Sequence, residues 1–362
     1  MTFYWILFIF VLVLCQTLRK GGKEKNALII SLFLIFIFFA FREGFTPDYY
    51  NYENAFLKYH DEIGADENYA DEIGFQMLCK VLPSYRALLV VFTLFYCLCA
   101  YIAIYRYVPR DKYSSSFAVM FLIVPFLLGN MTGMRSGFVS CFFFFAIFAK
   151  GLKGSWLGIA IAVGIIFLST FMHMSALALL PLLLVPTGPF NKFVVKGLYI
   201  VAAIMIIAVT LFPQMLNQWI TDITANFFEE SHYDLYLQGS IVESQFSLFS
   251  IAKNAALFYI LYLLMIRIQA EKNTMVNLST KFAVLFILLC LLPQSAVGIS
   301  RFQYYFAFPT IIAIPHVIKN VSKNERLFFI GSISYFIFYQ MRLFMQNPVT
   351  LQFYMFYDNV LF

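Results

Sequence analysis

The sequence contains little charge. Asp, Glu, Lys and Arg make up 12% of its 362 residues, against about a quarter of an average soluble domain. Hydrophobic residues make up 62% and form repeated runs close to the roughly 20 residues that cross a bilayer as a helix. This composition excludes an ordinary soluble protein and predicts an all-α polytopic membrane protein. The first run, 2–18, lacks a preceding basic region and a following cleavage site, which favours a retained helix over a signal peptide.

Several chemical motifs are missing as well. There is no HExxH, no paired Asp motif and no CxxC spacing, so the sequence predicts neither a metal site nor a disulfide framework. No glycine-rich P-loop occurs, so nucleotide hydrolysis is not expected, and no cofactor is predicted. The formal charge is +6, but the basic residues are scattered between apolar runs and form no patch, which argues against nucleic-acid binding.

Twelve apolar windows are candidate transmembrane helices, and they make residues 1–362 a single integral membrane domain. The windows are 2–18, 26–41, 85–107, 114–131, 134–150, 155–172, 174–187, 193–213, 247–268, 278–299, 302–319 and 326–344. The seventh window is short and contains Pro181, so we expect it to be tilted, broken or able to span only part of the bilayer.

Charge orients these windows. The short connections on one side hold 17 of the 25 Lys and Arg residues but only four of the 19 acids. The other side has two long segments, 42–82 with nine acids and three basic residues, and 214–246 with five acids and no Lys or Arg. Because Lys and Arg accumulate on the cytoplasmic side, both termini and both long loops are predicted to face outward, into the periplasm or the cell exterior.

A polar interruption lies between two of the apolar runs. The stretch from Gly129 to Gly137 is broken by glycines and carries Arg135. A bilayer tolerates non-helical backbone only where protein or trapped water satisfies its polar groups, and an arginine at that depth marks a candidate functional site. A helix that starts near Arg135 would add unpaired N–H groups, which favour an anion.

The predicted topology brings six unusual residues to the outer face, where they form the candidate site. These residues are Arg42, Asp48, Arg135, His173, Arg301 and Arg342. Arginine is unusual on this outer face, because basic residues accumulate on the cytoplasmic side. Guanidinium holds phosphate through paired hydrogen bonds, so the four arginines predict an anionic ligand such as a diphosphate. The alternative is that arginines at the ends of spans extend to lipid headgroups.

Two of the six residues could accept a proton. His173 closes an apolar helix, and imidazole accepts protons near neutral pH, which suits a general base; an interfacial histidine bonded to nearby backbone is the alternative. Asp48 follows Pro47 among tyrosines and could be a second base, a sugar ligand or a helix N-cap. Lys253 lies near the outer end of the ninth window, where it could pair with Glu243, with the ligand or with headgroups.

Five short motifs occur in a characteristic order along the chain. They are Phe41-Arg42 with Gly44, Asp48-Tyr49-Tyr50-Asn51-Tyr52, Met134-Arg135-Ser136-Gly137, His173-Met174-Ser175-Ala176 and the late Asn347-Pro348. Their order resembles that of the EpsG family of Wzy-like polymerases, and the resemblance extends from the second window to the last. It implies an architecture similar to the C-type membrane glycosyltransferases and a place in the bacterial cytoplasmic (inner) membrane.

The resemblance also implies a reaction. A glycosyltransferase of this kind polymerises a surface polysaccharide, such as O-antigen, capsule or exopolysaccharide, from oligosaccharide repeat units carried on undecaprenyl diphosphate. It works at the periplasmic face without a metal or cofactor. Under this hypothesis the four arginines bind the diphosphate, Arg135 stabilises the charge on that leaving group, and His173 or Asp48 is the base. Membrane lipid surrounds the enzyme, and a flippase and a chain-length regulator are candidate partners.

Two alternatives stay open. A lipid-linked oligosaccharide flippase or another transporter would also need cations for diphosphate, but it would place ionisable groups along a path at the bilayer midplane, often with inverted repeats. A ligase of the O-antigen type, which moves glycan to another acceptor, would use the same fold and cations. The order of the motifs favours the polymerase.

Overall fold

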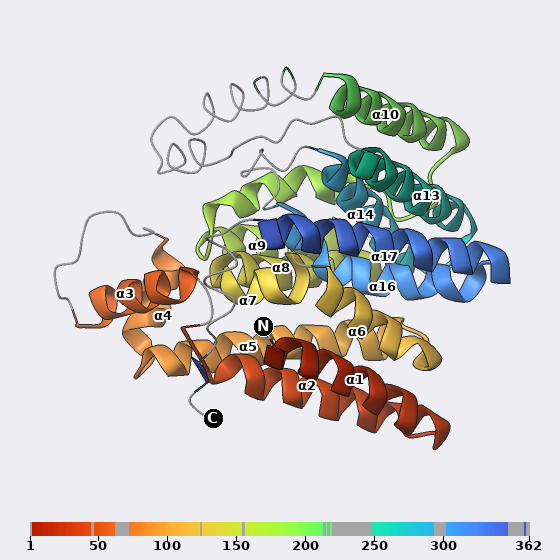
Figure 1. The fold of residues 1–362 in the computed structure, drawn as a ribbon. Coiled ribbons are helices and arrows are strands. Elements are labelled where there is room, and N and C mark those ends of the chain that lie inside the picture. Colours follow the sequence, from red (N-terminus) through yellow and green to blue (C-terminus); the bar gives the residue numbers. More distant parts are fainter. Residues whose placement is uncertain are drawn as a thin grey trace.

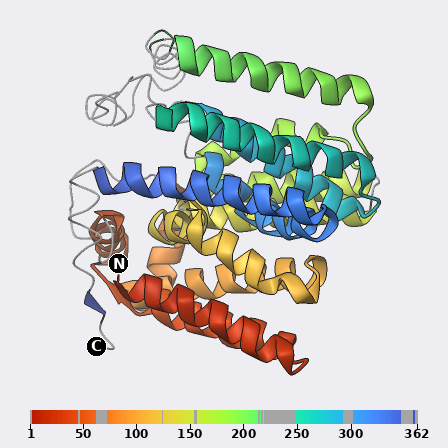
Figure 2. The same cartoon turned by 45° about the vertical axis from the view of Figure 1, so that its right-hand side comes forward.

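The protein is built from helices that run back and forth along one direction (Figures 1 and 2). The computed structural model describes residues 2–44, 47–61, 72–123, 125–153, 156–212, 215, 218, 248–292, 302–346 and 358–359. Within these ranges the only strands are β1 (Arg42–Glu43) and β2 (Asp358–Asn359), which pair antiparallel with Arg42 opposite Asn359. This pairing brings the end of the chain to the end of the second helix, beside the start of the first helix (Figure 1).

The helices fall into long and short elements. The long ones are α1 (Thr2–Lys20), α2 (Glu24–Ala40), α3 (Pro47–Asp61), α5 (Tyr85–Tyr107), α8 (Met134–Lys153), α9 (Trp156–Thr170), α10 (Lys192–Leu211), α13 (Leu248–Ala270), α14 (Thr274–Leu291), α16 (Ala307–Asn320) and α17 (Lys323–Gln346). The short ones are α4 (Ile73–Val81), α6 (Tyr113–Leu122), α7 (Asn130–Thr132), the 3₁₀ helices η1 (Arg110–Lys112), η3 (Met174–Leu184) and η4 (Phe302–Phe306), and the π-helix η2 (Pro125–Gly129).

The predicted all-α membrane class is confirmed. Six described helices are long and apolar enough to cross a membrane, and the bent pair Arg110–Leu122 and Phe126–Thr132 would be a seventh. A helix overlaps each of the twelve apolar windows, but several are short: α2 has 17 residues and α9 has 15. The count of twelve crossings, the outward termini and the outward loops therefore stay predictions.

Aromatic side chains fill the centre of the bundle. The central helix α14 is buried along most of its length, whereas α10 lies at the edge of the bundle (Figure 2). Phe126 packs on Phe286 at 4.8 Å between ring centroids, and Phe143 packs on Phe282 at 5.2 Å. Edge-on and offset ring pairs of this kind add about 0.5–1.5 kcal/mol each beyond the area that they bury. Part of the phenylalanine excess is thus core packing.

The chain between α6 and α8 breaks from a straight helix path just before the polar stretch that runs from Gly129 to Gly137. The helical segments Arg110–Leu122 and Phe126–Thr132 are bent by 58° relative to each other. Tyr96 donates a hydrogen bond of 3.1 Å to the carbonyl of Phe126 in the π-helix η2. Asn130 is fully buried and donates to the carbonyl of Tyr304 at 3.2 Å. Side chains from other helices thus supply hydrogen bonds at this break, as the bilayer interior requires.

The seventh window forms the 3₁₀ helix η3, and lysines hold its C-terminal end. Lys150 of α8 donates to the carbonyls of Leu183 and Val185. Lys281 of α14 donates to Pro186, at 2.6 Å, and to Gly188. Helix ends leave carbonyls without partners, and charged donors are strong replacements. The two lysines therefore anchor η3 to its neighbours at the end of the bundle away from α3 and α4.

Gly137 allows α8 to pack closely on the break. A Cβ atom at this position would lie 2.6 Å from the carbonyl oxygen of Asn130 and would also overlap the ring of Phe92. Backbone cannot move aside as a flexible side chain can, so a larger residue must push α8 away from the break. The start of α8, and with it Arg135, is therefore positioned by this glycine.

We expect Gly137→Ala to lower the free energy of unfolding by about 1–3 kcal/mol, because overpacking a tight contact displaces backbone. The measurement is the thermal unfolding midpoint of the purified protein in detergent. Gly164→Ala in α9 is the matched control, since its Cβ would meet nothing within 4 Å and alanine favours helix. Equal midpoints for the two variants would contradict the proposed packing role of Gly137.

Candidate functional site

Four elements meet at one end of the bundle and bring together a carboxylate, a guanidinium and an imidazole. Glu72 precedes α4, Arg135 is the second residue of α8, and His173 lies between α9 and η3. Arg135 Nη1 donates to Glu72 Oε2, and His173 Nδ1 lies 2.9 Å from Glu72 Oε1. The fourth element is α3, whose Tyr52 ring lies 5.9 Å from the Arg135 guanidinium. We call Tyr52, Glu72, Arg135 and His173 the Glu72 cluster.

A backbone hydrogen bond aligns the two members of the cluster that come from loops. The N–H of Gly74 donates to the carbonyl of Phe171 at 2.8 Å. Glu72 is two residues before Gly74 and His173 is two residues after Phe171, so this single contact holds both residues close together. A Cβ atom on residue 74 would lie 2.7 Å from that carbonyl oxygen, so glycine is required for this approach.

The charge of Glu72 determines which nitrogen of His173 carries a proton. Burial by itself raises the pKa of Glu72, but the hydrogen bond from His173 and the charge of Arg135 outweigh it and leave the pKa below its ordinary value. An ionised carboxylate only accepts hydrogen bonds, so Nδ1 of His173 must donate. In neutral His173 the lone pair is then on Nε2, the atom on the far side of the ring. The arrangement suits proton acceptance at Nε2.

The predicted outer motifs converge around this cluster. Ser175, two residues after His173, lies 2.5 Å from the hydroxyl of Tyr305 in η4. Asn130, in the broken stretch before Arg135, bonds to the carbonyl of Tyr304 in the same element. Three sequence-distant segments that were predicted to share one face are therefore packed together. Arg301 itself lies outside the described residues, directly before η4.

Arg42 occupies a different place from the one that we predicted for a phosphate ligand. It is 1% exposed, and its Nη1 and Nη2 donate to the carbonyls of Phe39, at 3.0 Å, and Met131, at 2.6 Å. These bonds connect the end of α2 to α7. Arg42 thus supports the broken stretch structurally, and its contribution to a diphosphate site stays a prediction.

The remaining predicted residues lie at the same end of the bundle. Asp48 is in the first turn of α3, half-buried, and its charge acts on the hydroxyl of Tyr52. It is therefore close to the Glu72 cluster. The N-cap position considered for Asp48 is wrong, because α3 already begins at Pro47. Arg342 belongs to α17, whose last residue, Gln346, is at this end of the bundle (Figure 1).

The sequence interpretation missed Glu72. It lies in the acidic segment 42–82, where the tetrapeptide Asp-Glu-Ile-Gly occurs at 61–64 and again at 71–74. Nothing in the sequence distinguishes the second copy, because the contact depends on Gly74 meeting the carbonyl of Phe171. Glu243, the suggested partner of Lys253, lies outside the described residues. Across the ranges described above, no three His, Cys, Asp or Glu side chains are grouped so that they could hold a metal ion.

Comparison with known proteins yields a match to one family. The family model described as EpsG family matches residues 25–359, which is nearly the whole chain. No curated protein and no solved structure matches the chain.

We expect Glu72→Gln to lower the free energy of unfolding by about 1–2 kcal/mol, below the 3–5 kcal/mol of a fully buried pair because the Arg135 side chain is 24% exposed. The pKa of Glu72 is lowered in the folded state, so its stabilising effect is present above the ordinary value of 4.5 and is lost as the pH falls further. Unfolding midpoints of wild type and variant should therefore converge only below about pH 4.5.

Glu43→Gln is the control for this measurement. Glu43 pairs with Arg86 at 3.9 Å, and its side chain is 51% exposed. Exposed pairs contribute only about 0–1 kcal/mol, so this variant should differ little from wild type at any pH. A Glu72→Gln midpoint equal to that of the control at neutral pH would contradict the central role of Glu72.

Proposed function

The chain belongs to the EpsG family of Wzy-like polysaccharide polymerases, and from this membership we propose that it joins oligosaccharide repeat units carried on undecaprenyl diphosphate. The reaction takes place at the outer face of the bacterial cytoplasmic membrane and needs no metal. The product is a surface polysaccharide of the O-antigen, capsule or exopolysaccharide type. The observation that supports this proposal is the Glu72 cluster, which combines a proton acceptor and a cation at one end of a membrane-embedded bundle.

The proposed reaction is a glycosyl transfer between two lipid-linked units. A hydroxyl oxygen of one unit bonds to the anomeric carbon of the other, and the bond from that carbon to the diphosphate oxygen breaks. His173 Nε2 accepts the hydroxyl proton. Without this transfer, the attacking oxygen would become a high-energy oxonium. The diphosphate departs with the bonding electrons, and its growing negative charge is stabilised by a cation that is already in place.

Arg135 is the proposed cation for the diphosphate. Guanidinium carries five N–H donors, and Glu72 engages it through Nη1. Glu72 thus orients both Arg135 and His173 with a single carboxylate. Arg301 and Arg342 are proposed as further diphosphate ligands, with Arg42 in a supporting position. Asp48 is the second candidate base because it lies near the cluster.

We expect Arg135→Ala and His173→Ala each to reduce polymerisation by at least about a hundredfold in the native host, since each removes a group that acts in the transition state. Polysaccharide and lipid-linked intermediates, resolved by size, should shift from long chains to single repeat units exposed outside the membrane. Arg86→Ala is the control, because Arg86 is a partly exposed arginine paired with the surface residue Glu43.

Other outcomes would assign a different activity. Repeat units retained on the cytoplasmic side would identify a flippase. Long chains that stay on the carrier lipid would identify a ligase. Normal chains in both variants would mean that Arg135 and His173 take no part in polymerisation.

Glu72→Gln should lower kcat about a hundredfold with little change in KM, because the carboxylate orients His173 and makes no proposed contact with sugar. The measurement is single-repeat transfer by the purified protein with synthetic lipid-linked donor and acceptor. Glu72→Asp keeps the charge and should restore part of kcat. A large rise in KM at normal kcat would instead place Glu72 in the sugar-binding site.

A further inference from the structure

A short helix beside the Glu72 cluster exposes apolar side chains. α4 starts at Ile73, directly after Glu72, and its 9 residues are too few to cross a membrane, which takes about 20. Ile73 and Met77 are each 60% exposed, and Val81 is 77% exposed. Residues four apart lie on the same side of a helix, so these three side chains line one face, which we call the apolar face of α4.

The opposite face of α4 is covered by protein. Phe75 and Cys79 are buried, and the ring of Phe75 packs on the ring of Tyr52 in α3 with 5.6 Å between the centroids. This packing fixes which way α4 is turned. Its apolar face therefore points away from α3 and needs another surface to cover it.

The exposed residues of α4 differ from those of its neighbour α3. Besides the apolar face, α4 exposes only Lys80, whereas the exposed residues of α3 over 48–60 are mixed: Tyr50, Asn51, Asn54, Leu57 and His60. A lysine beside an apolar face lays its hydrocarbon stem along that face and extends its ammonium to the lipid headgroups. The surface of α4 is therefore typical of a helix that lies in a membrane interface.

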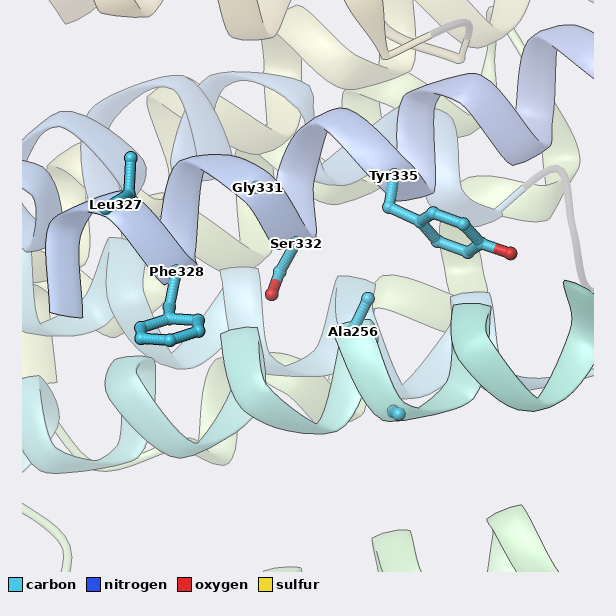
Figure 3. A pocket seen from close by; sticks show the side chains of 7 residues that line it. Ala256, Leu327, Phe328, Gly331, Ser332 and Tyr335 are labelled. Atoms are coloured by element: carbon cyan, nitrogen blue, oxygen red, sulfur yellow. The ribbon is translucent and has the colours of Figure 1, made fainter. Parts of the chain in front are cut away.

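Many other exposed apolar side chains lie on helices that run the length of the bundle. Figure 3 shows an example, the groove between α13 and α17, where Phe328 projects toward α13 and Ala256 projects back. Leu327, which also lines this groove, is 72% exposed. Because α13 contains the candidate membrane span Ile251–Gln269, lipid hydrocarbon accounts for exposure of this kind. The length of α4 gives no such explanation, so the contacts at its two ends decide what covers it.

Both ends of α4 are attached at places where helices of the bundle end. Near its start, the N–H of Gly74 donates to the carbonyl of Phe171 at 2.8 Å, directly after α9 ends at Thr170. At its other end, only residues 82–84 separate it from α5, whose residues Tyr85–Tyr107 are a candidate membrane span. Since α5 and α9 both pack on α8, α4 crosses this end of the bundle, where Figure 1 shows it together with α3.

The exposed apolar surface of α9 leads directly to α4. Phe167 and Leu168 are each 57% exposed near the end of α9, and Phe171 is also exposed. Phe171 is the residue that Gly74 contacts, and Ile73 is the neighbour of Gly74 in the chain. A lipid leaflet that covers the last turns of α9 therefore reaches the start of the apolar face of α4, and removing this area from water is favourable.

We propose that the apolar face of α4 lies in the lipid leaflet at the Glu72 end of the bundle, with Lys80 among the phosphate headgroups. The helix then acts as an anchor. Because Glu72 directly precedes Ile73, the anchor holds the carboxylate of the Glu72 cluster at the level of the headgroups. This inference does not depend on the proposed function, since it concerns the position of the cluster in the membrane and not the reaction.

The test is the accessibility of a fluorescent label to quenchers in the lipid and in the water. Met77→Cys is labelled with nitrobenzoxadiazole in the full-length protein, which is reconstituted into phosphatidylcholine vesicles. The six native cysteines are buried, so the unmodified protein serves as the labelling blank. Phosphatidylcholine brominated on its acyl chains should quench this label at least about twofold more than aqueous iodide does, because an interfacial helix buries its apolar face about 5–10 Å into the lipid boundary.

Asn54→Cys is the matched control, because Asn54 is exposed on α3 at the same end of the bundle. Iodide should quench its label more than the brominated lipid does. Val81→Cys repeats the measurement in the last turn of α4, in case the change at Met77 impairs folding. Stronger quenching by iodide at both α4 positions overturns the proposal and places the face in water. Weak quenching by both reagents also overturns it and shows that protein, such as a second copy of the chain, covers the face.

Met77→Asp tests whether the apolar face enters the lipid as a unit. A carboxylate is costly in a lipid environment, so this change should reduce the quenching of a label at position 81 by brominated lipid at least about twofold, whereas Met77→Leu should retain it. Equal quenching at position 81 in these two variants would contradict the anchoring role of α4.

Discussion

The ionised carboxylate of Glu72 is the interaction on which the site depends. It accepts from Arg135, 63 residues away, and pairs with His173, 101 residues away, so one side chain joins three separate parts of the chain. Each of these groups would be costly alone at the membrane surface, because an unpaired buried charge loses its hydration without compensation. Together they neutralise one another, and the imidazole keeps its Nε2 lone pair. The contacts that stabilise these charged groups are the same contacts that orient them for the reaction.

The rest of the bundle sets the level at which these groups meet. The 3₁₀ helix η3 has 11 residues and rises about 22 Å, because each residue adds about 2.0 Å. Arg135 and Lys150 are 15 residues apart on α8, which at about 1.5 Å per residue is also about 22 Å. Since Lys150 binds the far end of η3, the equal lengths bring His173 level with Arg135 at the near end. A regular α-helix of 11 residues would fall short by about 6 Å.

Sequence patterns predicted those features of the structure that depend on local amino-acid composition. The helices, the break near Gly129 and the convergence of its flanking segments with the His173 motif follow from apolar runs, glycines and the direction of the loop charges. Glu72 could not be found in this way, because its partners are chosen by the backbone contact between Gly74 and Phe171. Arg42 was predicted to face a ligand, yet two of its nitrogens bind carbonyls of Phe39 and Met131. The sequence shows that a residue is charged, but it does not show whether the folded protein already provides a hydrogen-bond acceptor for that residue.

The cations differ as candidate ligand sites because the folded protein provides them with different numbers of hydrogen-bond acceptors. Lys150 and Lys281 each bind two carbonyls, and Arg42 binds two through separate nitrogens. Arg135 gives Nη1 to Glu72 and, as a guanidinium, has further donors for a phosphate. Lys253 has an aromatic ring beside it and no carboxylate in the described part of the chain. Arg135 is therefore the cation in this comparison that keeps hydrogen-bond donors beyond those that its protein partner engages, and this is why we propose it for the diphosphate.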